Sequence, residues 1–303
     1  MHEETVMLDG IMVLWFLLTG LSLVFVILDL LTNTPVSWVQ KFAWILVIAY
    51  TGPIGLFMFL LTCRSPGRGL HDQFTKASWK QGVNSEMHCL AGDATGIIVS
   101  AIILSFMALS PGVDLIIEYV AAWVTGLFIF QALMMIGMFN NNYFKAVRKT
   151  IFVETVSMNM VMVGMIPVMV VLLHEFPSSD DPWNPLFWFR MSMGTVVGGL
   201  IGFPINWWMV HKGIKHGCMS TPEKAMATSA GHDMPMGDGE AHGEHAGHDM
   251  PMDHDMSMDH GSSCHGMDMP SLPLWQQLAW STATFALLAV AIWITTMFAP
   301  IKF

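Results

Sequence analysis

Charged residues are scarce in this chain of 303 residues. Asp, Glu, Lys and Arg together make up 12% of the sequence, whereas 53% of the residues are hydrophobic. Soluble domains carry about 25% charged residues, so this composition predicts an integral membrane protein. The chain also has no excess of positive charge, because the formal net charge is −10. Nothing in the sequence therefore supports nucleic-acid binding.

Motifs of the common enzyme classes are absent too. The sequence has no Gly-rich phosphate loop, no nucleophile elbow and no His-Glu-x-x-His. Its four cysteines lack the close, regular spacing of a zinc or redox motif; they are Cys63, Cys89, Cys218 and Cys264. We therefore expect no enzymatic activity, and a membrane redox enzyme is only a distant alternative.

Seven apolar segments are long enough to cross a bilayer, which takes about 20 residues each. They lie at 10–31, 39–62, 88–109, 115–139, 151–173, 186–211 and 275–298. The predicted fold is an all-α, polytopic transmembrane helix bundle. Its expected parts are a six-span core at 1–216, a His/Met-rich loop at 217–273 and a seventh helix at 274–303.

The basic residues predict how the chain is oriented. Ten of the thirteen Lys and Arg residues follow the second, fourth and sixth spans, and so lie on one side of the membrane. The positive-inside bias makes this the cytoplasmic side of the inner membrane. It places the N-terminus and the loop after the sixth span in the cytoplasm.

This loop contains the most unusual stretch of the chain, residues 231–269. The stretch holds seven His, eight Met and one Cys together with nine acidic residues, and it has no Lys or Arg. It contributes −9 to the formal net charge. Its candidate metal ligands are His232, Met234, Met236, His242, His245, His248, Met250, Met252, His254, Met256, Met258, His260, Cys264, His265, Met267 and Met269.

Thioether, imidazole and thiolate groups are ligands that suit Cu(I), whereas a run of carboxylates alone would suit calcium or magnesium. Copper is therefore the expected metal, with zinc or nickel as alternatives. The plain alternative is an acidic, solvated, low-complexity loop that binds nothing. We expect the loop to be disordered without metal, because it has little apolar surface to bury.

A second group of candidate ligands lies at the third span, where His88 and Cys89 open the segment and Asp93 follows one turn later. Ionisable residues inside a span are costly and are functional candidates for that reason. Cys63, Glu154 and His211 are expected at the same depth. The alternative is that the histidines are interfacial residues whose polar tips stay in water.

Span five carries a stripe of methionines on one helical face. Glu154, Met158, Met162, Met165 and Met169 follow helical spacing. Because thioethers bind Cu(I) without carrying charge into the membrane, Met158 and Met162 are candidate ligands along a copper path. The alternative is ordinary core packing, for which methionine is well suited.

Glycine and proline mark close contacts inside the spans. Gly92 and Gly96, and Gly198 and Gly202, form Gly-x-x-x-Gly pairs, which predict close helix packing. Residues 51–55, Thr-Gly-Pro-Ile-Gly, interrupt the second span with a proline.

Three segments resemble an uncharacterised family of bacterial multi-pass membrane proteins, catalogued only as a domain of unknown function. They are residues 50–55, residues 88–93, and residues 204–208 continuing to 211–215. The resemblance covers about 38–216 and brings no established activity. It implies that the spans are a shared core to which the loop and span seven are appended. Some relatives carry a second Cys after the His-Cys pair; here Asp93 stands there, which weakens a purely thiolate site.

The sequence thus predicts a membrane copper-handling protein that transports Cu(I) or delivers it. The expected partners are the metal ion, membrane lipid, and a copper transporter, chaperone or cuproenzyme. A metal sensor or an assembly scaffold that transports nothing is the alternative.

Overall fold

The computed structural model describes residues 2–67, 70–107, 109–139, 141–215 and 272–301. These residues form helices and short connections, and there is no strand among them. Seven helices are long and apolar enough to cross a membrane, so the predicted all-α bundle is confirmed. Every candidate ligand from His232 to Met269 lies outside the described residues.

The seven spans correspond to the seven predicted segments. The N-terminal half contains α1 (His2–Thr32), α2 (Trp38–Thr62), the short α3 (His71–Thr75) and α4 (Ser78–Leu104). The fourth span is α5 (Pro111–Val124), which continues through the π-helix η1 (Thr125–Gln131) into α6 (Ala132–Met135) and the 3₁₀ turn η2 (Ile136–Phe139). The remainder is α7 (Tyr143–Glu175), the 3₁₀ turn η3 (Pro177–Asp180), α8 (Pro185–His211) and α10 (Leu274–Phe298).

Polar caps set where several of these helices begin. The side chain of Asn142 accepts a hydrogen bond from the backbone N–H of Lys145 at the start of α7. Asn184 caps α8 in the same way, with Pro185 as the first helical residue. Both are favoured starts, because the cap oxygen satisfies an amide that has no partner within the helix, and proline has no such amide.

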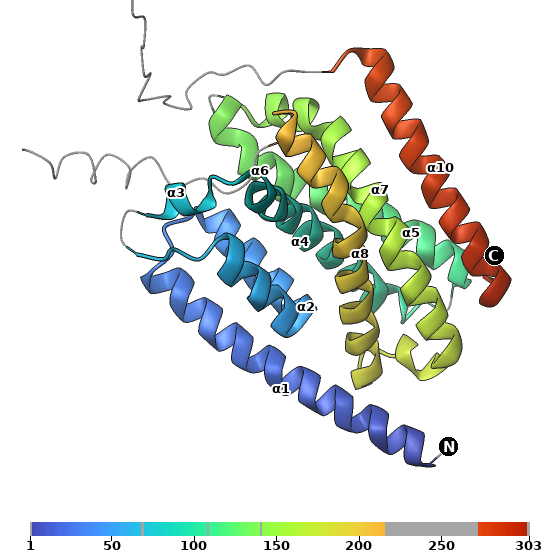
Figure 1. The fold of residues 1–303 in the computed structure, drawn as a ribbon. Coiled ribbons are helices and arrows are strands. Elements are labelled where there is room, and N and C mark those ends of the chain that lie inside the picture. The colour runs from blue at the N-terminus through green and yellow to red at the C-terminus, as the bar shows by residue number, and fades with distance from the viewer. Residues whose placement is uncertain (1, 68–69, 108, 140, 216–271, 302–303) are drawn as a thin grey trace, which may run out of the picture.

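Helix α4 lies at the centre of the bundle. It packs against α2, α5, η1, α7 and α8. In contrast, α1 packs mainly on α2, and α10 packs on α7. The two outer helices therefore lie at opposite edges of the bundle (Figure 1). Only a central helix can carry several polar side chains away from lipid, so α4 is the natural position for a functional site.

Three helices begin at least eight residues before the predicted spans, and the first of them is α1, which starts at His2 instead of residue 10. Helix α4 starts at Ser78 instead of residue 88, and α7 starts at Tyr143 instead of residue 151. The first ten residues of α4 are too polar for hydropathy to predict a span there, yet neighbouring helices bury many of them. The prediction that His88 and Cys89 open the span is therefore wrong. They lie about 15 Å from its first residue, at a rise of 1.5 Å per residue.

The Gly-x-x-x-Gly pairs mark close helix contacts, as predicted. A Cβ at Gly92 would lie 2.6 Å from the Cα of Gly126. One at Gly198 would lie 3.0 Å from the carbonyl oxygen of Val161, which belongs to α7. Glycine at these positions lets α4 approach η1, and α8 approach α7, nearly backbone to backbone.

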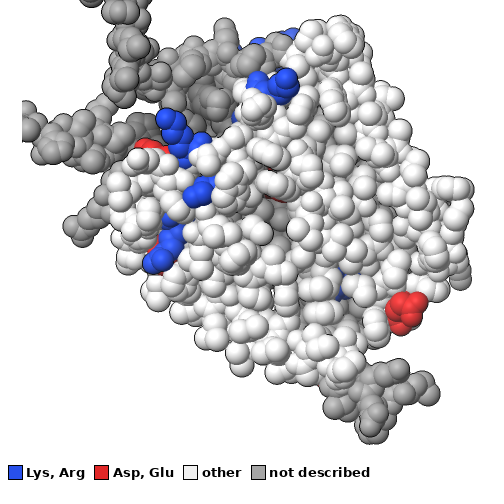
Figure 2. All heavy atoms as spheres, in the orientation of Figure 1, with Lys and Arg blue, Asp and Glu red and all other residues white. Residues whose placement is uncertain are grey.

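Basic side chains gather near one end of the molecule, the end at which α3 and α6 lie in Figure 1 (Figure 2). The rest of the visible face is almost free of charge. This distribution agrees with a bundle whose apolar belt faces lipid and whose connections on one side are basic.

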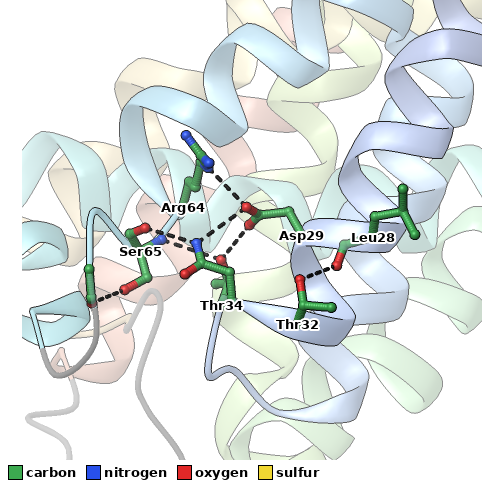
Figure 3. A network of polar contacts seen from close by, with 8 residues as sticks. Leu28, Asp29, Thr32, Thr34, Arg64 and Ser65 are labelled. Carbon is green, nitrogen blue, oxygen red and sulfur yellow. Dashed lines mark hydrogen bonds and ion pairs between the residues drawn. The ribbon is translucent and has the colours of Figure 1, made fainter.

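A polar clamp joins the ends of α1 and α2 at this end (Figure 3). The carboxylate of Asp29 accepts hydrogen bonds from Arg64 at 2.9 Å and from the hydroxyl of Thr34 at 2.7 Å. Asn33 donates to the same carboxylate at 3.2 Å and to the carbonyl of Ser65 at 2.9 Å. The clamp fixes α1, which otherwise has few partners in the bundle.

Asp29→Ala should lower the free energy of unfolding by about 1–3 kcal/mol, because it removes a charge-assisted bond and leaves Thr34 without its acceptor. Thermal unfolding in detergent measures the effect. Arg148→Ala is the control, since Arg148 is an exposed basic residue outside the clamp. Equal midpoints for the two variants would show that the clamp does not stabilise the fold.

Candidate functional site

The inner face of α4 carries a row of buried polar side chains. Glu86, His88, Cys89 and Asp93 are each at most 3% exposed. Cys89 and Asp93 lie one turn apart on one face, while His88 is turned about 100° around the helix. Burial of so many ionisable groups in a membrane span requires specific partners, which come from α7, α8 and η1.

Cys89 is the centre of this arrangement. Its Sγ lies 2.9 Å from Oε2 of Glu154 on α7 and donates a hydrogen bond to it. Gln131, the last residue of η1, lies on another side with its Oε1 at 3.8 Å from Sγ. The thiol therefore joins three spans that are far apart in sequence.

Asp93 and Glu154 approach each other over Gly126. A Cβ at Gly126 would lie 2.3 Å from Oε1 of Glu154 and 2.8 Å from Oδ1 of Asp93. Only a glycine leaves room for both carboxyl groups. Gly126 lies within the π-helix η1, and such segments occur frequently at functional sites. The two oxygens of Asp93 and Oε1 of Glu154 have no hydrogen-bond partner within the described part of the chain.

Lys215 completes the site from an unexpected direction. Helix α8 ends at His211, and Gly213 follows with a φ of 69°, a left-handed conformation that favours glycine. The N–H of Ile214 then bonds the carbonyl of Met209 at 3.1 Å, as in a Schellman helix end. Because this turn folds the chain back onto the bundle, Lys215 is only 1% exposed.

The ammonium of Lys215 has a partner for each of its three protons. Nζ donates to Sγ of Cys89 at 3.0 Å, to Oγ of Ser157 at 3.2 Å, and to Oδ1 of Asn206. Ser157 in turn donates to Asn206 at 2.9 Å. An ammonium has three donors and no acceptor, so this set saturates it.

We call this group the Cys89 cluster; its members are Cys89, Asp93, Gln131, Glu154, Ser157, Asn206 and Lys215. It is a cation site lined by a thiol, a hydroxyl, two amides and two carboxyl groups, and a lysine occupies it. One ammonium cannot neutralise both carboxylates, and leaving a charge uncompensated in this environment is expensive. The cluster can therefore hold a further proton or cation.

The structure brings together only some of the residues predicted for this site. Glu154 joins Cys89 and Asp93 as expected. Cys63 instead accepts a long hydrogen bond from Gln40 at 3.9 Å, and His211 is exposed.

Both ring nitrogens of His88 are buried and have no hydrogen-bond partner among the described residues. Within the described ranges, no three His, Cys, Asp or Glu side chains are placed to hold a metal ion.

The methionine stripe of α7 lies inside the bundle and does not face lipid. Met158, Met162, Met165 and Met169 are each at most 6% exposed. They share one hydrophobic cluster with Phe187 and Met191. Met158 follows Glu154 by one helical turn, so the stripe leads away from the Cys89 cluster through the core. The burial of these methionines in the hydrophobic cluster fits both predicted roles, packing and metal ligation.

Sequence reasoning missed several members of the cluster. In the sequence, Lys215 is one of the basic residues that indicate the cytoplasmic side and it ends the family-like segment 211–215, but neither pattern predicts a site residue. Gln131, Ser157 and Asn206 are polar residues within apolar spans, which is a signal that could have found them. No local pattern reveals that Gly213 returns Lys215 to the bundle.

Gly126→Ala should lower the stability of the protein by about 1–3 kcal/mol, because a Cβ there displaces the Glu154 carboxylate from Cys89. Gly137→Ala is the matched control, since a Cβ at Gly137 meets no atom within 4 Å. Thermal unfolding of both variants makes the comparison. Indistinguishable midpoints would contradict the close approach of the two carboxyl groups.

Lys215→Met should destabilise the protein by about 3 kcal/mol, because it removes a buried cation that hydrogen-bonds Cys89, Ser157 and Asn206 near two acidic groups. Adding Glu154→Gln should recover part of the loss by removing the charge left behind. Lys212→Met, at an exposed position three residues away, should change little. A double-mutant cycle on thermal midpoints measures the coupling, and strictly additive effects would show that Lys215 does not balance Glu154.

One of three comparisons with known proteins gives a match, and its range starts later than the predicted family-like range of about 38–216. The model of the family described as a domain of unknown function, DUF4396, matches residues 78–215. Neither the curated proteins nor the solved structures gave a match. The matched range begins at α4 and ends at Lys215, so it includes the whole Cys89 cluster, whereas residues 50–55 of α2 precede it. The resemblance predicted from the sequence is thus confirmed over residues 78–215, and the part of this chain that holds the cluster is similar to the DUF4396 family.

Proposed function

We propose that this protein handles copper in a membrane, with the Cys89 cluster as its buried cation site and residues 231–269 as the segment that collects the metal. The observation that carries the proposal is the position of Lys215. A protein cation already occupies a pocket lined by a thiol, an amide, a hydroxyl and a nearby carboxylate. A metal ion would take the place of the ammonium.

The chemistry of the exchange is simple. Metals bind the thiolate and not the thiol, so Cys89 must lose its proton. Glu154, 2.9 Å from the sulfur, is placed to receive it. Lys215 withdraws as the cation arrives, and the charge in the cluster is kept. Thiolate sulfur suits Cu(I), whereas the carboxylates alone would suit harder ions.

The connection to the His/Met-rich stretch supports the same function. In the sequence, Lys215 is followed by residues 216–230 and then by the stretch that begins at residue 231. A change in the metal load of that stretch would act on the residue that fills the cluster. The basic residues at this end support a cytoplasmic position for both, in the inner membrane.

Two versions of this function remain, and they differ in whether copper crosses the membrane. A transporter would pass Cu(I) from the Cys89 cluster along Met158 and Met162. A sensor or assembly scaffold would only bind it and signal to a copper transporter, chaperone or cuproenzyme. The tight burial of Met158 and Met162, each at most 1% exposed, favours binding without passage in this conformation.

Cu(I) uptake by proteoliposomes separates the two versions. If the protein transports copper, Cys89→Ser should reduce uptake by on the order of tenfold or more. Replacing residues 231–269 with a Gly/Ser linker of equal length should reduce uptake mainly at low copper. Cys63→Ser is the control, because Cys63 is equally buried but contacts Gln40 outside the cluster.

Copper binding without flux would identify the scaffold, and Met158→Leu and Met162→Leu should then leave function intact. The absence of copper binding by the intact protein, together with unchanged copper tolerance in cells that lack it, would contradict both versions.

A further inference from the structure

A cavity of about 250 Å³ lies between α2, α4 and α8, and no member of the Cys89 cluster lines it. Its wall is almost entirely apolar and includes Met58, Met87, Leu90 and Phe203. Methionine side chains adapt their shape easily, so such a wall accommodates ligands of varied form.

The wall of the cavity includes small residues of both α2 and α8. Helix α2 is broken at Gly52, which has φ 57° and ψ −134°, and Pro53 follows. Thr51, Ile54 and Gly55 from this interruption line the cavity. On the opposite wall is Gly199, where a Cβ would lie 3.2 Å from Leu90. The Thr-Gly-Pro-Ile-Gly sequence thus shapes a hollow that the Cys89 cluster does not require.

Glu86 is the one acidic group in the wall, and no basic residue lines it. Besides the indole N–H of Trp79, which is at the mouth, the other polar side chains there are two threonines whose hydroxyls already donate hydrogen bonds. Thr51 donates to the carbonyl of Val47 at 2.6 Å, and Thr195 donates to that of Met191 at 2.7 Å. In contrast, Oε1 of Glu86 has no hydrogen-bond partner among the described residues, although the side chain is only 2% exposed.

The mouth of the cavity faces outward from the bundle. Its lining includes Leu200, which is 62% exposed, and Leu61 and Trp79, which are 40% exposed. All three belong to helices long enough to cross a membrane, so a ligand would enter sideways from the lipid. The face shown in Figure 2 is almost entirely uncharged, as such a route requires.

We propose that this cavity is a binding site for a single-chain amphiphilic amine, whose ammonium donates to Glu86 and whose apolar chain lies against α2 and α8. An apolar pocket with one unpartnered polar group is a typical small-molecule site. An amine fits because the wall offers an acid and no base. The cavity is smaller than the roughly 300–1,000 Å³ of drug-sized sites, which excludes both chains of a diacyl lipid.

Competition binding to the full-length protein in phosphatidylcholine nanodiscs tests the proposal. Radiolabelled dodecylamine is the probe, and unlabelled dodecylamine, dodecanol and dodecanoate are the competitors, compared at equal mole fraction in the bilayer. The amine should compete at least tenfold better than the alcohol, and the carboxylate should compete least. Glu86→Gln should remove the preference for the amine over the alcohol. Glu118→Gln, a change of an acid on another span, should keep it.

Filling the cavity should abolish binding of all three competitors. Gly199→Leu does so from the wall, and Leu200→Trp does so from the exposed mouth, where added bulk does not strain the core. Saturable dodecylamine binding that both filled variants lose, with a preference that depends on Glu86, is the expected result. Absence of saturable binding, equal competition by the alcohol, or a preference that survives Glu86→Gln would overturn the proposal.

Discussion

The ammonium of Lys215 is the interaction on which the interior of this bundle depends. It compensates a group of acidic side chains that no other described residue neutralises, and it does so within the spans, where an unpaired charge is most costly. Its three bonds reach α4, α7 and α8 through Cys89, Ser157 and Asn206. The three most closely packed helices are thus held together by a cation from the segment that follows them.

The close approach of these helices has its origin in small residues. Gly92, Gly126 and Gly198 allow backbones to meet, and Gly126 also leaves space for the carboxyl groups of Asp93 and Glu154. The π-helix at residues 125–131 lies between α5 and α6 and brings Gln131 toward Cys89. Packing and function therefore impose the same requirement at this point: any larger residue would disturb both the helix contact and the site.

The sequence was sufficient to predict the fold and part of the site. Seven spans follow from hydropathy, because lipid selects long apolar segments. The start of α4 was missed for the same reason, since a central helix is shielded by protein and tolerates polar residues such as Asn84 and Glu86. Cys89 and Asp93 were found as ionisable groups in a span. Lys215 was not, because its place depends on a turn at Gly213 and on contacts with residues distant in sequence.

The two proposed sites lie next to each other along the same helix and have different neighbours. Glu86 faces an apolar cavity between α2 and α8, while Cys89, three residues later, faces α7 and the Lys215 ammonium. Each takes a cationic group, but in a different setting: one is open toward lipid, and the other is enclosed by protein. Helix α4 thus contributes a residue to both sites, and the ammonium of Lys215 occupies the one at Cys89.

The central claim is that copper replaces Lys215 at Cys89, and X-ray absorption of Cu(I)-loaded protein tests it most directly. The protein to use has residues 231–269 replaced by a Gly/Ser linker, so that only the buried site contributes. The account predicts one bound copper with a sulfur ligand, and Cys89→Ser should remove that sulfur. Copper that is absent, or that is bound unchanged after Cys89→Ser, would contradict it.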